Sequence, residues 1–365
     1  MIAPVATRRF VGRDAELAQL HELRRAAARG RPSMALVGGE AGMGKSRLLW
    51  EFTRSLTGGR APLLAQSECL ERASRPLGPI RTIISAIATS APSLAVTVSP
   101  LARRVLEQLL PYAGADSRAD AEALDKEDLF VGIHEIFATI AQKRASVLTI
   151  EDLHWADSAT LEVLEYLAQR LTTMRLFFVI TLRDDVLASE SPLACTLGRL
   201  EREQTVHLVS LQPLGQPALH ALLESSLNGR TSLTSEGLRE IEVLSDGNPL
   251  WAQELLKNRL AGGSRRRVLP RSIQTLVSER VAQLGRRGRR VLMHAAVLGE
   301  RFDASTLALV LGCAVDRLSP ALQHASELDL VMEESGSSLR FRFRHALTRE
   351  ALYQSQLALS LRPLH

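Results

Sequence analysis

One stretch near the amino terminus has the residue types and spacing that bind phosphate. It reads GEAGMGKS from Gly39 to Ser46 and fits the pattern G-x-x-x-x-G-K-[ST] at every fixed position. Gly39, Gly42 and Gly44 permit backbone angles that turn successive N–H groups toward phosphate oxygens. Lys45 can then place its charge between the β- and γ-phosphates, and the Ser46 hydroxyl can bind Mg²⁺. The alternative is a glycine turn that holds a lysine by chance.

The segments on either side of this stretch fit a phosphate loop. Residues 33–38 (SMALVG) form a short apolar run that is typical of a buried strand, and residues 47–56 (RLLWEFTRSL) continue with the apolar spacing of a helix. Strand, glycine loop and helix therefore follow in the required order. Upstream, residues 10–14 (FVGRD) precede an amphipathic helix, at a position that suits a segment closing over a nucleotide base.

A second strand is predicted to end in acids. Residues 146–152 (SVLTIED) are an apolar run that finishes with Glu151 and Asp152. Acids at the carboxyl end of a strand in phosphate-loop enzymes hold Mg²⁺ and orient the water that attacks the γ-phosphate. We assign Glu151 to the metal and Asp152 to the water. The alternative is a strand followed by an acidic helix cap.

Three further strands complete the predicted sheet, at residues 61–69, 175–181 and 204–211. Arg183 follows the second of these three at its carboxyl end. Ligands bind at that edge of a parallel sheet, so Arg183 is a candidate sensor of the γ-phosphate. An ordinary arginine at a strand end is the alternative.

Composition excludes several protein classes. With 365 residues and 45% hydrophobic content, the chain is expected to form two or three packed domains. It has no apolar run long enough for a membrane span and no apolar core of a secretory signal, so we predict a cytoplasmic protein. Cys69, Cys195 and Cys313 lack metal-ligand spacing and are predicted to be buried, small apolar residues.

The pattern changes to helices after Pro213, with a break at GNPL (residues 247–250). Three short helices and two alternating strands at residues 329–333 and 339–343 then suggest a winged helix. Arginines cluster at residues 265–267 and 286–290. In a winged helix such charge can contact DNA phosphates; the alternative, a solvated linker and turn, is favoured because no recognition helix rich in aromatic or amide residues accompanies it.

Six motifs in order carry a family resemblance: FVGRDAEL, GEAGMGKSRLL, VLTIEDLHWAD, TLRDD, GNPLWAQEL and FRHALTREALY. Together they resemble the STAND class of signal-transduction ATPases, and most closely the ATPase module of large LuxR-type bacterial transcriptional regulators. The resemblance spans residues 10–365. It implies an α/β, AAA+-like P-loop NTPase domain with a parallel five-stranded sheet flanked by helices, followed by a small helical domain and a winged-helix domain.

The resemblance also implies roles for individual residues. Glu151 and Asp152 form the Walker B pair with Glu151 and Ser46 on Mg²⁺, Arg183 matches the sensor arginine, and Lys45, Asp152 and Arg183 serve catalysis. Pro249 matches a lid proline that packs on the base, and His345 matches a winged-helix histidine that contacts ADP, although a buried structural histidine is equally compatible with the sequence. The residues expected to contact ATP or ADP are Val11, Gly12, Arg13, Gly39, Gly42, Met43, Gly44, Lys45, Ser46, Arg47, Pro249 and His345.

The expected domain limits follow from the same reading. They are a disordered lead-in at residues 1–9, a nucleotide-binding domain at 10–212, a helical lid at 213–263, a winged helix at 264–356, and the start of a truncated helical region at 357–365. The family's regulators continue into helical repeats and a C-terminal helix-turn-helix, so DNA contact is expected through a segment absent from this chain.

The expected function is a switch between an ADP-bound, autoinhibited state and an ATP-bound, self-associating state, under an unidentified inducer or regulatory protein and without membrane contact. The family often has Asp-Asp where this chain has Glu151-Asp152, and an Asp base suits slow hydrolysis. Two other functions stay open. One is a DNA-binding AAA+ ATPase of the origin-recognition or remodelling type, and the other is a non-hydrolysing scaffold that holds ADP.

Overall fold

The computed structural model of the protein describes residues 10–56, 61–70, 75–90, 97–110, 124–183, 192–227, 234–260, 269, 271–328, 330–334 and 339–360. These residues divide into two units. One unit is Arg13–Leu211, and the other runs from Gln212 onward and includes Gly12 and the residues before it. The predicted lead-in at 1–9, the arginines at 265–267 and the last five residues lie outside the described residues.

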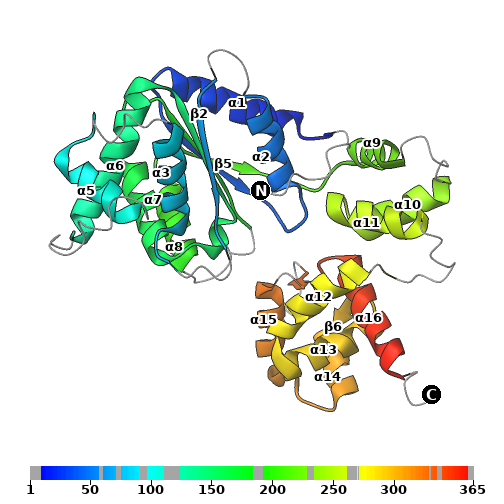
Figure 1. Ribbon diagram of the computed structural model, residues 1–365. Helices are drawn as coiled ribbons and strands as arrows, with labels where there is room; N and C mark the ends of the chain where they lie inside the picture. Colours follow the sequence, from blue (N-terminus) through cyan, green and yellow to red (C-terminus); the bar gives the residue numbers. More distant parts are fainter. Residues whose placement is uncertain are drawn as a thin grey trace. The chain divides into compact units, whose positions relative to one another are not determined.

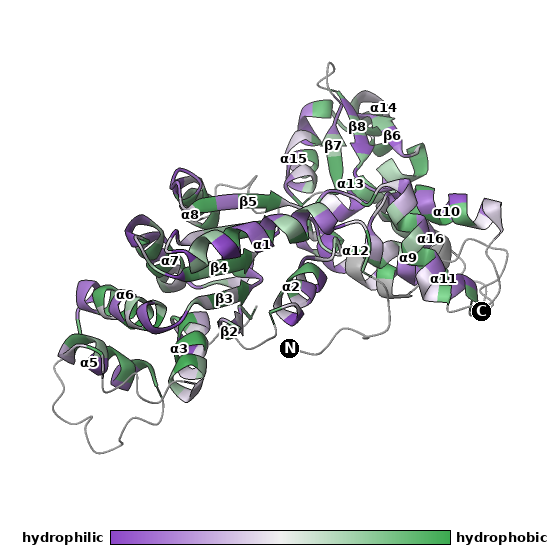
Figure 2. Ribbon diagram, turned by 90° about the horizontal axis from the view of Figure 1, so that it is seen from above, coloured by the Kyte–Doolittle hydropathy of each residue, from purple (hydrophilic) through white to green (hydrophobic). Residues whose placement is uncertain are grey.

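A five-stranded parallel sheet forms the centre of the first unit, as predicted. The sheet order is β2-β3-β4-β1-β5, and every neighbouring pair is parallel. All residues of β1, β3 and β4 are buried, as expected for a parallel sheet covered on both faces. Figure 2 shows β4, LFFVIT, coloured as largely hydrophobic. The strands are β1 Ser33–Gly38, β2 Leu63–Glu68, β3 Ser146–Glu151, β4 Leu176–Thr181 and β5 Val206–Ser210.

Helices cover both faces of this sheet (Figure 1). Successive residues of a strand point to opposite faces, so Phe177 and Phe178 of β4 mark the two sides. Phe52 of α2 meets Phe177 with ring centroids 5.9 Å apart, and Phe137 of α6 meets Phe178 at 5.9 Å. The described helices of the unit are α1 Asp14–Ala28, α2 Lys45–Arg54, α3 Gly78–Ser90, α5 Pro100–Leu109, α6 Lys126–Lys143, η2 Leu153–Trp155, α7 Ser158–Arg170 and α8 Pro192–Leu200.

The second unit is mostly helical and contains a small antiparallel sheet. β7 and β8 pair antiparallel, which confirms the predicted hairpin, and β6 adds to the other edge of β8. Neither β6 nor α15 was predicted. The elements are α9 Gln216–Leu227, α10 Ser235–Ser245, α11 Pro249–Leu260, α12 Arg271–Gln283, α13 Gly285–Leu298, β6 Arg301–Asp303, α14 Ala304–Leu311, η4 Val315–Arg317, α15 Ser319–Glu327, β7 Val331–Glu333, β8 Arg340–Phe343 and α16 Ala346–Ser360.

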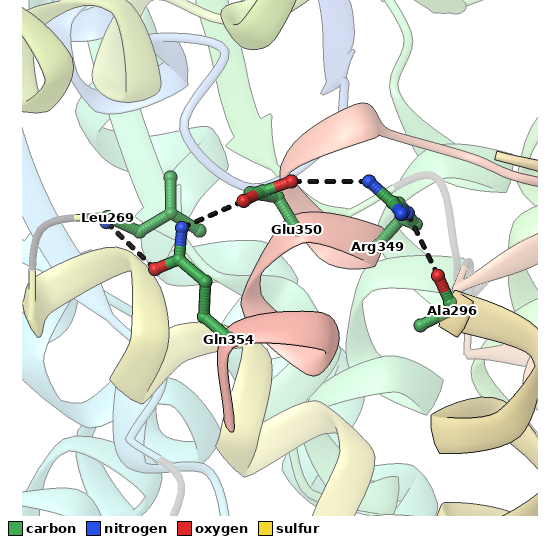
Figure 3. Close-up of polar contacts among 5 residues, drawn as sticks. All are labelled: Leu269, Ala296, Arg349, Glu350 and Gln354. Atoms are coloured by element: carbon green, nitrogen blue, oxygen red, sulfur yellow. Dashed lines mark hydrogen bonds and ion pairs between the residues drawn. The ribbon is translucent and has the colours of Figure 1, made fainter. Parts of the chain in front are cut away.

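Polar contacts attach α16 to the rest of the second unit (Figure 3). Arg349 donates to the carbonyl of Ala296 at the end of α13 (2.9 Å) and pairs with Glu350 (3.3 Å). Glu350 in turn accepts from the Gln354 amide, whose oxygen accepts from the backbone N–H of Leu269. This chain of bonds fixes α16 against both the start of α12 and the end of α13.

Two sequence expectations are corrected by the structure. Residues 286–290 are not a turn: they form the first turns of α13, because Leu284, Gly288, Val291 and Leu292 supply a buried helical stripe. Cys195 is exposed on α8 and Cys313 is only half-buried, whereas Cys69 is buried as expected. Among the described residues no single helix has the length and hydropathy of a membrane span, although the bent pair formed by α14 and residues 315–327 passes that test when taken together.

Candidate functional site

The loop between β1 and α2 has the backbone shape that the glycine pattern predicted. Gly44 precedes α2 with φ 92° and ψ 25°, in the left-handed region that side chains disfavour. Gly39 and Gly42 also have positive φ, at 153° and 88°. A Cβ at Gly44 would meet no heavy atom within 4 Å. Backbone conformation rather than crowding therefore requires glycine there, and the space over this peptide is open to a ligand.

Lys45 is the first residue of α2, and its charge is held inside the loop. Its side chain is buried, and the residue is only 8% exposed. The ammonium donates to the carbonyl oxygens of Gly39 (2.6 Å) and Glu40 (2.9 Å). Phosphate oxygens are stronger acceptors for an ammonium than neutral carbonyls are. The loop therefore holds a buried cation at the N-terminus of α2, where anions bind favourably.

Ser46 and Glu151 meet across the sheet edge. The Ser46 hydroxyl donates a hydrogen bond to the carboxylate of Glu151, the last residue of β3. Burial raises the pKa of the Glu151 carboxyl, the bond from Ser46 opposes that shift, and the carboxylates of Asp152 and Glu68 raise the pKa further. Glu68 is the register partner of Glu151 on β2. Negative charge from these carboxylates is thus concentrated at this edge of the sheet.

This donor set fits Mg²⁺. The hydroxyl of Ser46 and the carboxylate of Glu151 are hard oxygen ligands, which magnesium prefers over nitrogen and sulfur. A cation there would relieve the unfavourable ionisation of Glu151. Cys69 lies close by, where its backbone N–H donates to the carbonyl of Glu151, and burial together with the carboxylates of Asp157 and Asp152 raises the pKa of its thiol to about 12.

Asp152 takes an unusual backbone conformation directly after β3. Its φ of 56° lies in the left-handed region, which aspartate tolerates better than most residues. Its backbone N–H donates to the Thr181 hydroxyl at 3.0 Å, and its carboxylate is partly exposed. Nδ1 of the buried His154 lies 3.9 Å from Asp152 Oδ1. Asp152 is thereby turned away from the strand with its carboxylate accessible at the sheet edge.

Thr181 was not recognised from the sequence. It is the last residue of β4 and is fully buried, and β4 lies between β1 and β3 in the sheet. Its hydroxyl is the acceptor that holds the backbone of Asp152. The available signal was its position: a hydroxyl residue at the end of an otherwise apolar strand, at the edge where the acids gather. Arg183 follows two residues later and is partly buried, and the residues just after it lie outside the described part of the chain.

Arg13 and Arg47 are engaged by protein groups. The guanidinium of Arg13 is buried, donates to the carbonyl of Met43 in the phosphate loop (3.3 Å) and pairs with Glu16 (3.1 Å). Arg47 pairs with Glu51 one turn along α2 (2.5 Å) and lies over the ring of Trp50. Arg13 thus supports the loop from α1, and its predicted place near the adenine stays a prediction.

The remaining predicted residues belong to the second unit. A Cβ at Gly12 would lie 2.5 Å from the Cβ of Ala218, so this glycine is required by packing as well as by its φ of 69°. Val11 packs against the same core, and Pro249 begins α11. His345 is 5% exposed, meets the ring of Trp251 edge-on at 4.6 Å, and has Nδ1 3.6 Å from Asp246 Oδ2. Their predicted contacts with nucleotide stay predictions.

The pKa of Glu151 leads to a prediction about stability. A carboxyl whose folded-state pKa is raised keeps its proton longer when folded, so stability is lost as pH rises from about 4.5 through the folded pKa. Replacing Glu151 with Gln is therefore expected to raise the Tm of nucleotide-free protein at pH 7, by about 2–4 °C for each kcal/mol gained. Thermal unfolding followed by circular dichroism between pH 4 and pH 8 measures this.

The difference in Tm between Glu151→Gln and the native chain is expected to shrink as pH falls below about 4.5, because the carboxyl is then protonated in both the unfolded and the folded state. Glu68→Gln is the matched control, because Glu68 is exposed on the neighbouring strand and should change Tm less. A lower Tm for Glu151→Gln at pH 7 would show that its bond to Ser46 outweighs the cost of burying the charge.

Comparison with known proteins agrees with this geometry. Residues 9–180, which include the phosphate loop and the Glu151-Asp152 pair, match the AAA ATPase domain family. An uncharacterised protein of Rhizobium meliloti (strain 1021) is 25% identical over 98% of this chain and 36% of its own length. The chain thus spans about a third of the curated relative that it matches.

Solved structures with a similar arrangement include a STAND protein with a tetratricopeptide-repeat sensor from Pyrococcus horikoshii. It is 18% identical, with a TM-score of 0.43, over 97% of this chain and 44% of that one. Cdc6p from Pyrobaculum aerophilum is 13% identical with a TM-score of 0.47, over 97% of both chains. The likeness is remote at these TM-scores and assigns no activity to this chain.

Proposed function

We propose that this chain is the ATPase switch of a STAND-class signalling protein, and that the whole protein regulates transcription in a bacterium. The observation that carries the proposal is the phosphate loop, where Gly44 takes the left-handed conformation before α2, Lys45 supplies a buried cation, and Ser46 bonds to Glu151. Each of these features belongs to the chemistry of binding the phosphates of a nucleoside triphosphate.

Each residue at this edge of the sheet then has a proposed role in ATP hydrolysis. Ser46 and Glu151 hold Mg²⁺, which when bound neutralises charge on the β- and γ-phosphates. Lys45 moves from the loop carbonyls to the phosphate oxygens. Asp152 accepts a hydrogen bond from the attacking water and takes its proton, and Thr181 keeps Asp152 in place through its backbone. Arg183 binds the γ-phosphate and so reports whether ATP or ADP is present.

The second unit is proposed to read the nucleotide state. The order α13-β6-α14-α15-β7-β8, with an antiparallel sheet, supports a winged helix in residues 264–356 after a helical lid in 213–263. Val11, Gly12, Arg13 and Pro249 are proposed to surround the base, and His345 to approach the phosphates of ADP. Differential contact with ATP and ADP is what lets such a unit shift a conformational equilibrium.

The resemblance to STAND-class ATPases supports further proposals for the whole protein. We propose self-association in the ATP state, release of that state by an inducer or regulatory protein, and a cytoplasmic location. An Asp base beside a buried Glu suits slow hydrolysis, as a timer requires. An ATPase of the origin-recognition or remodelling type would instead turn over rapidly, and a scaffold would hold ADP without turning over ATP.

One experiment separates these functions. Nucleotide released from denatured, purified protein is identified by chromatography, and single-turnover release of γ-phosphate is then followed after loading with Mg²⁺-ATP. Retained ADP followed by slow, complete release of one phosphate per chain supports the switch. Retained ADP with no release over hours indicates the scaffold. Rapid multiple turnover that is stimulated by DNA indicates the remodelling ATPase and contradicts the switch.

A further inference from the structure

Exposed arginines gather at the start of α13. Arg286, Arg287, Arg289 and Arg290 all lie within its first two turns, and all four are exposed. The guanidinium of Arg287 donates to the carbonyl of Arg317 in η4 at 3.0 Å, which places a fifth exposed arginine beside them. We call these five residues the α13 arginine cluster. They belong to the second unit, whereas the phosphate loop belongs to the first.

Carboxylates do not neutralise this cluster within the described part of the chain. Other arginines of the same unit are paired: Arg301 with Glu334 at 3.2 Å, Arg259 with Glu240 at 2.7 Å and Arg349 with Glu350. Among the described residues, no arginine of the α13 cluster forms such an ion pair. Asp316 is adjacent to Arg317 in sequence and is the one acid that directly flanks a member of the cluster.

The cluster is unfavourable for the isolated chain. Arg286 lies one turn from both Arg289 and Arg290, and like charges at these spacings destabilise a helix by about 0.2–0.5 kcal/mol per pair. Positive charge in a first helical turn also opposes the helix dipole. The arginine side chains are exposed, so burial of apolar surface offsets little of this repulsion. Helix formation alone would be served better by glutamate or glutamine at these positions.

We propose that the α13 arginine cluster binds the phosphodiester backbone of double-stranded nucleic acid. Guanidinium groups bind phosphates in a two-pronged geometry, and their spacing of about 5–6 Å along the helix surface offers several contacts to one backbone. Binding would exchange mutual repulsion for phosphate contacts and release counterions. Contacts to phosphate oxygens carry no information about the base sequence, so binding through the cluster is expected to be independent of sequence.

This inference goes beyond the ATPase switch, because it places a nucleic-acid contact within this chain. The sequence analysis expected DNA contact through a helix-turn-helix outside it. The cluster would hold the regulator on DNA without selecting a site, while selection of a site would belong to that other segment. Neither Lys45 nor any other residue of the proposed nucleotide site takes part, so the two proposals can fail separately.

The test measures binding of the full 365-residue chain to fluorescent 20-base-pair duplexes of two unrelated sequences, by anisotropy from 50 to 200 mM salt. The variant Arg286→Gln/Arg289→Gln/Arg290→Gln removes three charges whose side chains make no hydrogen bond in the described residues. The control Arg29→Gln/Arg31→Gln/Arg202→Gln removes three exposed charges from the first unit. We expect the cluster variant to lose at least about tenfold in affinity, with a salt slope smaller by about 2.7, whereas the control keeps both.

Unfolding curves separate loss of binding from loss of structure. Because the cluster is repulsive, its variant is expected to have a Tm equal to or above that of the native chain without nucleic acid. The proposal is overturned if the native chain shows no saturable duplex binding at 50 mM salt, or if both triple variants lose affinity equally. Binding to phosphatidylserine vesicles without binding to duplex would also overturn it, since it would identify a membrane surface as the partner.

Discussion

Replacing Lys45 with Ala is expected to lower the affinity for ATP and for ADP by at least about 10- to 100-fold. The estimate follows from the loss of charged hydrogen bonds worth about 1.5–3 kcal/mol, with 1.4 kcal/mol per factor of ten. Lys45 is the one cationic side chain within GEAGMGKS. Calorimetric titration of nucleotide-free protein with Mg²⁺-ATP measures the effect.

The matched control for this substitution is Lys143→Ala. Lys143 lies at the exposed end of α6 and donates to Thr97, far along the chain from the loop. Its removal is expected to leave nucleotide affinity unchanged. Circular dichroism checks that Lys45→Ala still folds, because the carbonyls of Gly39 and Glu40 lose their donor. An affinity of Lys45→Ala within twofold of the native value would contradict the assignment of the loop as a phosphate cradle.

Replacing Asp152 with Asn is expected to leave ATP binding intact and to slow γ-phosphate release by about 10²–10⁴-fold, the usual contribution of a general base. Asparagine is preferred to alanine as the replacement because it tolerates the left-handed backbone of this position, where φ is 56°. It also keeps the backbone N–H that bonds to Thr181. The measurement is a single-turnover assay with ATP labelled at the γ-phosphate.

Glu68→Gln controls for general loss of negative charge at the same sheet edge. Glu68 is exposed on β2 and pairs in register with Glu151, so it lies at the same edge of the sheet but is not the proposed general base. It is expected to keep hydrolysis within a few-fold of the native rate, on the order of the effect of a screened surface charge. If Asp152→Asn releases phosphate as fast as the native chain, Asp152 is not the base and the acid of this site must be assigned again.

The sheet and several helices could be predicted because their signals are local. Residues 33–38 are an uninterrupted apolar run, and the observed β1 has the same limits. The predicted helix at residues 126–143 likewise matches α6, where Phe130, Ile133, Phe137 and Ile140 repeat at helical spacing and are buried. The phosphate loop could be predicted equally well. Its glycines stand at fixed positions because the backbone there has positive φ angles, which is a local requirement.

Features that depend on tertiary contacts could not be predicted from the sequence. β6 has three residues and gains its partner β8 from a segment almost forty positions later. α15 lacks a continuous apolar pattern, and only Leu322 and Ala325 of its residues are buried. Thr181 acquires its role from the register of β3 beside β4, which brings the N–H of Asp152 to its hydroxyl. Residues 286–290 were predicted to form a turn because four arginines and a glycine show no apolar spacing by themselves. The buried face of α13 is formed mainly by residues that follow them.

The sequence and the structure give different information about His345. The sequence left it open between a ligand of ADP and a buried structural histidine. The structure places its ring against Trp251 of α11 and beside Asp246, at the point where α10 ends. That packing accounts for its burial within the second unit. That His345 binds ADP remains a proposal. It predicts a contact between His345 and the nucleotide, which the packing against Trp251 does not require.

The central claim is that the loop at residues 39–46 binds nucleoside phosphates. The measurement that tests it most directly is an equilibrium titration of Mg²⁺-ATP onto native chain freed of nucleotide, with ADP as competitor. Saturation at one nucleotide per chain, displaced by ADP, is the predicted result. A native chain that shows no saturable binding of either nucleotide while fully folded would contradict the account, and the buried charge of Lys45 would need another explanation.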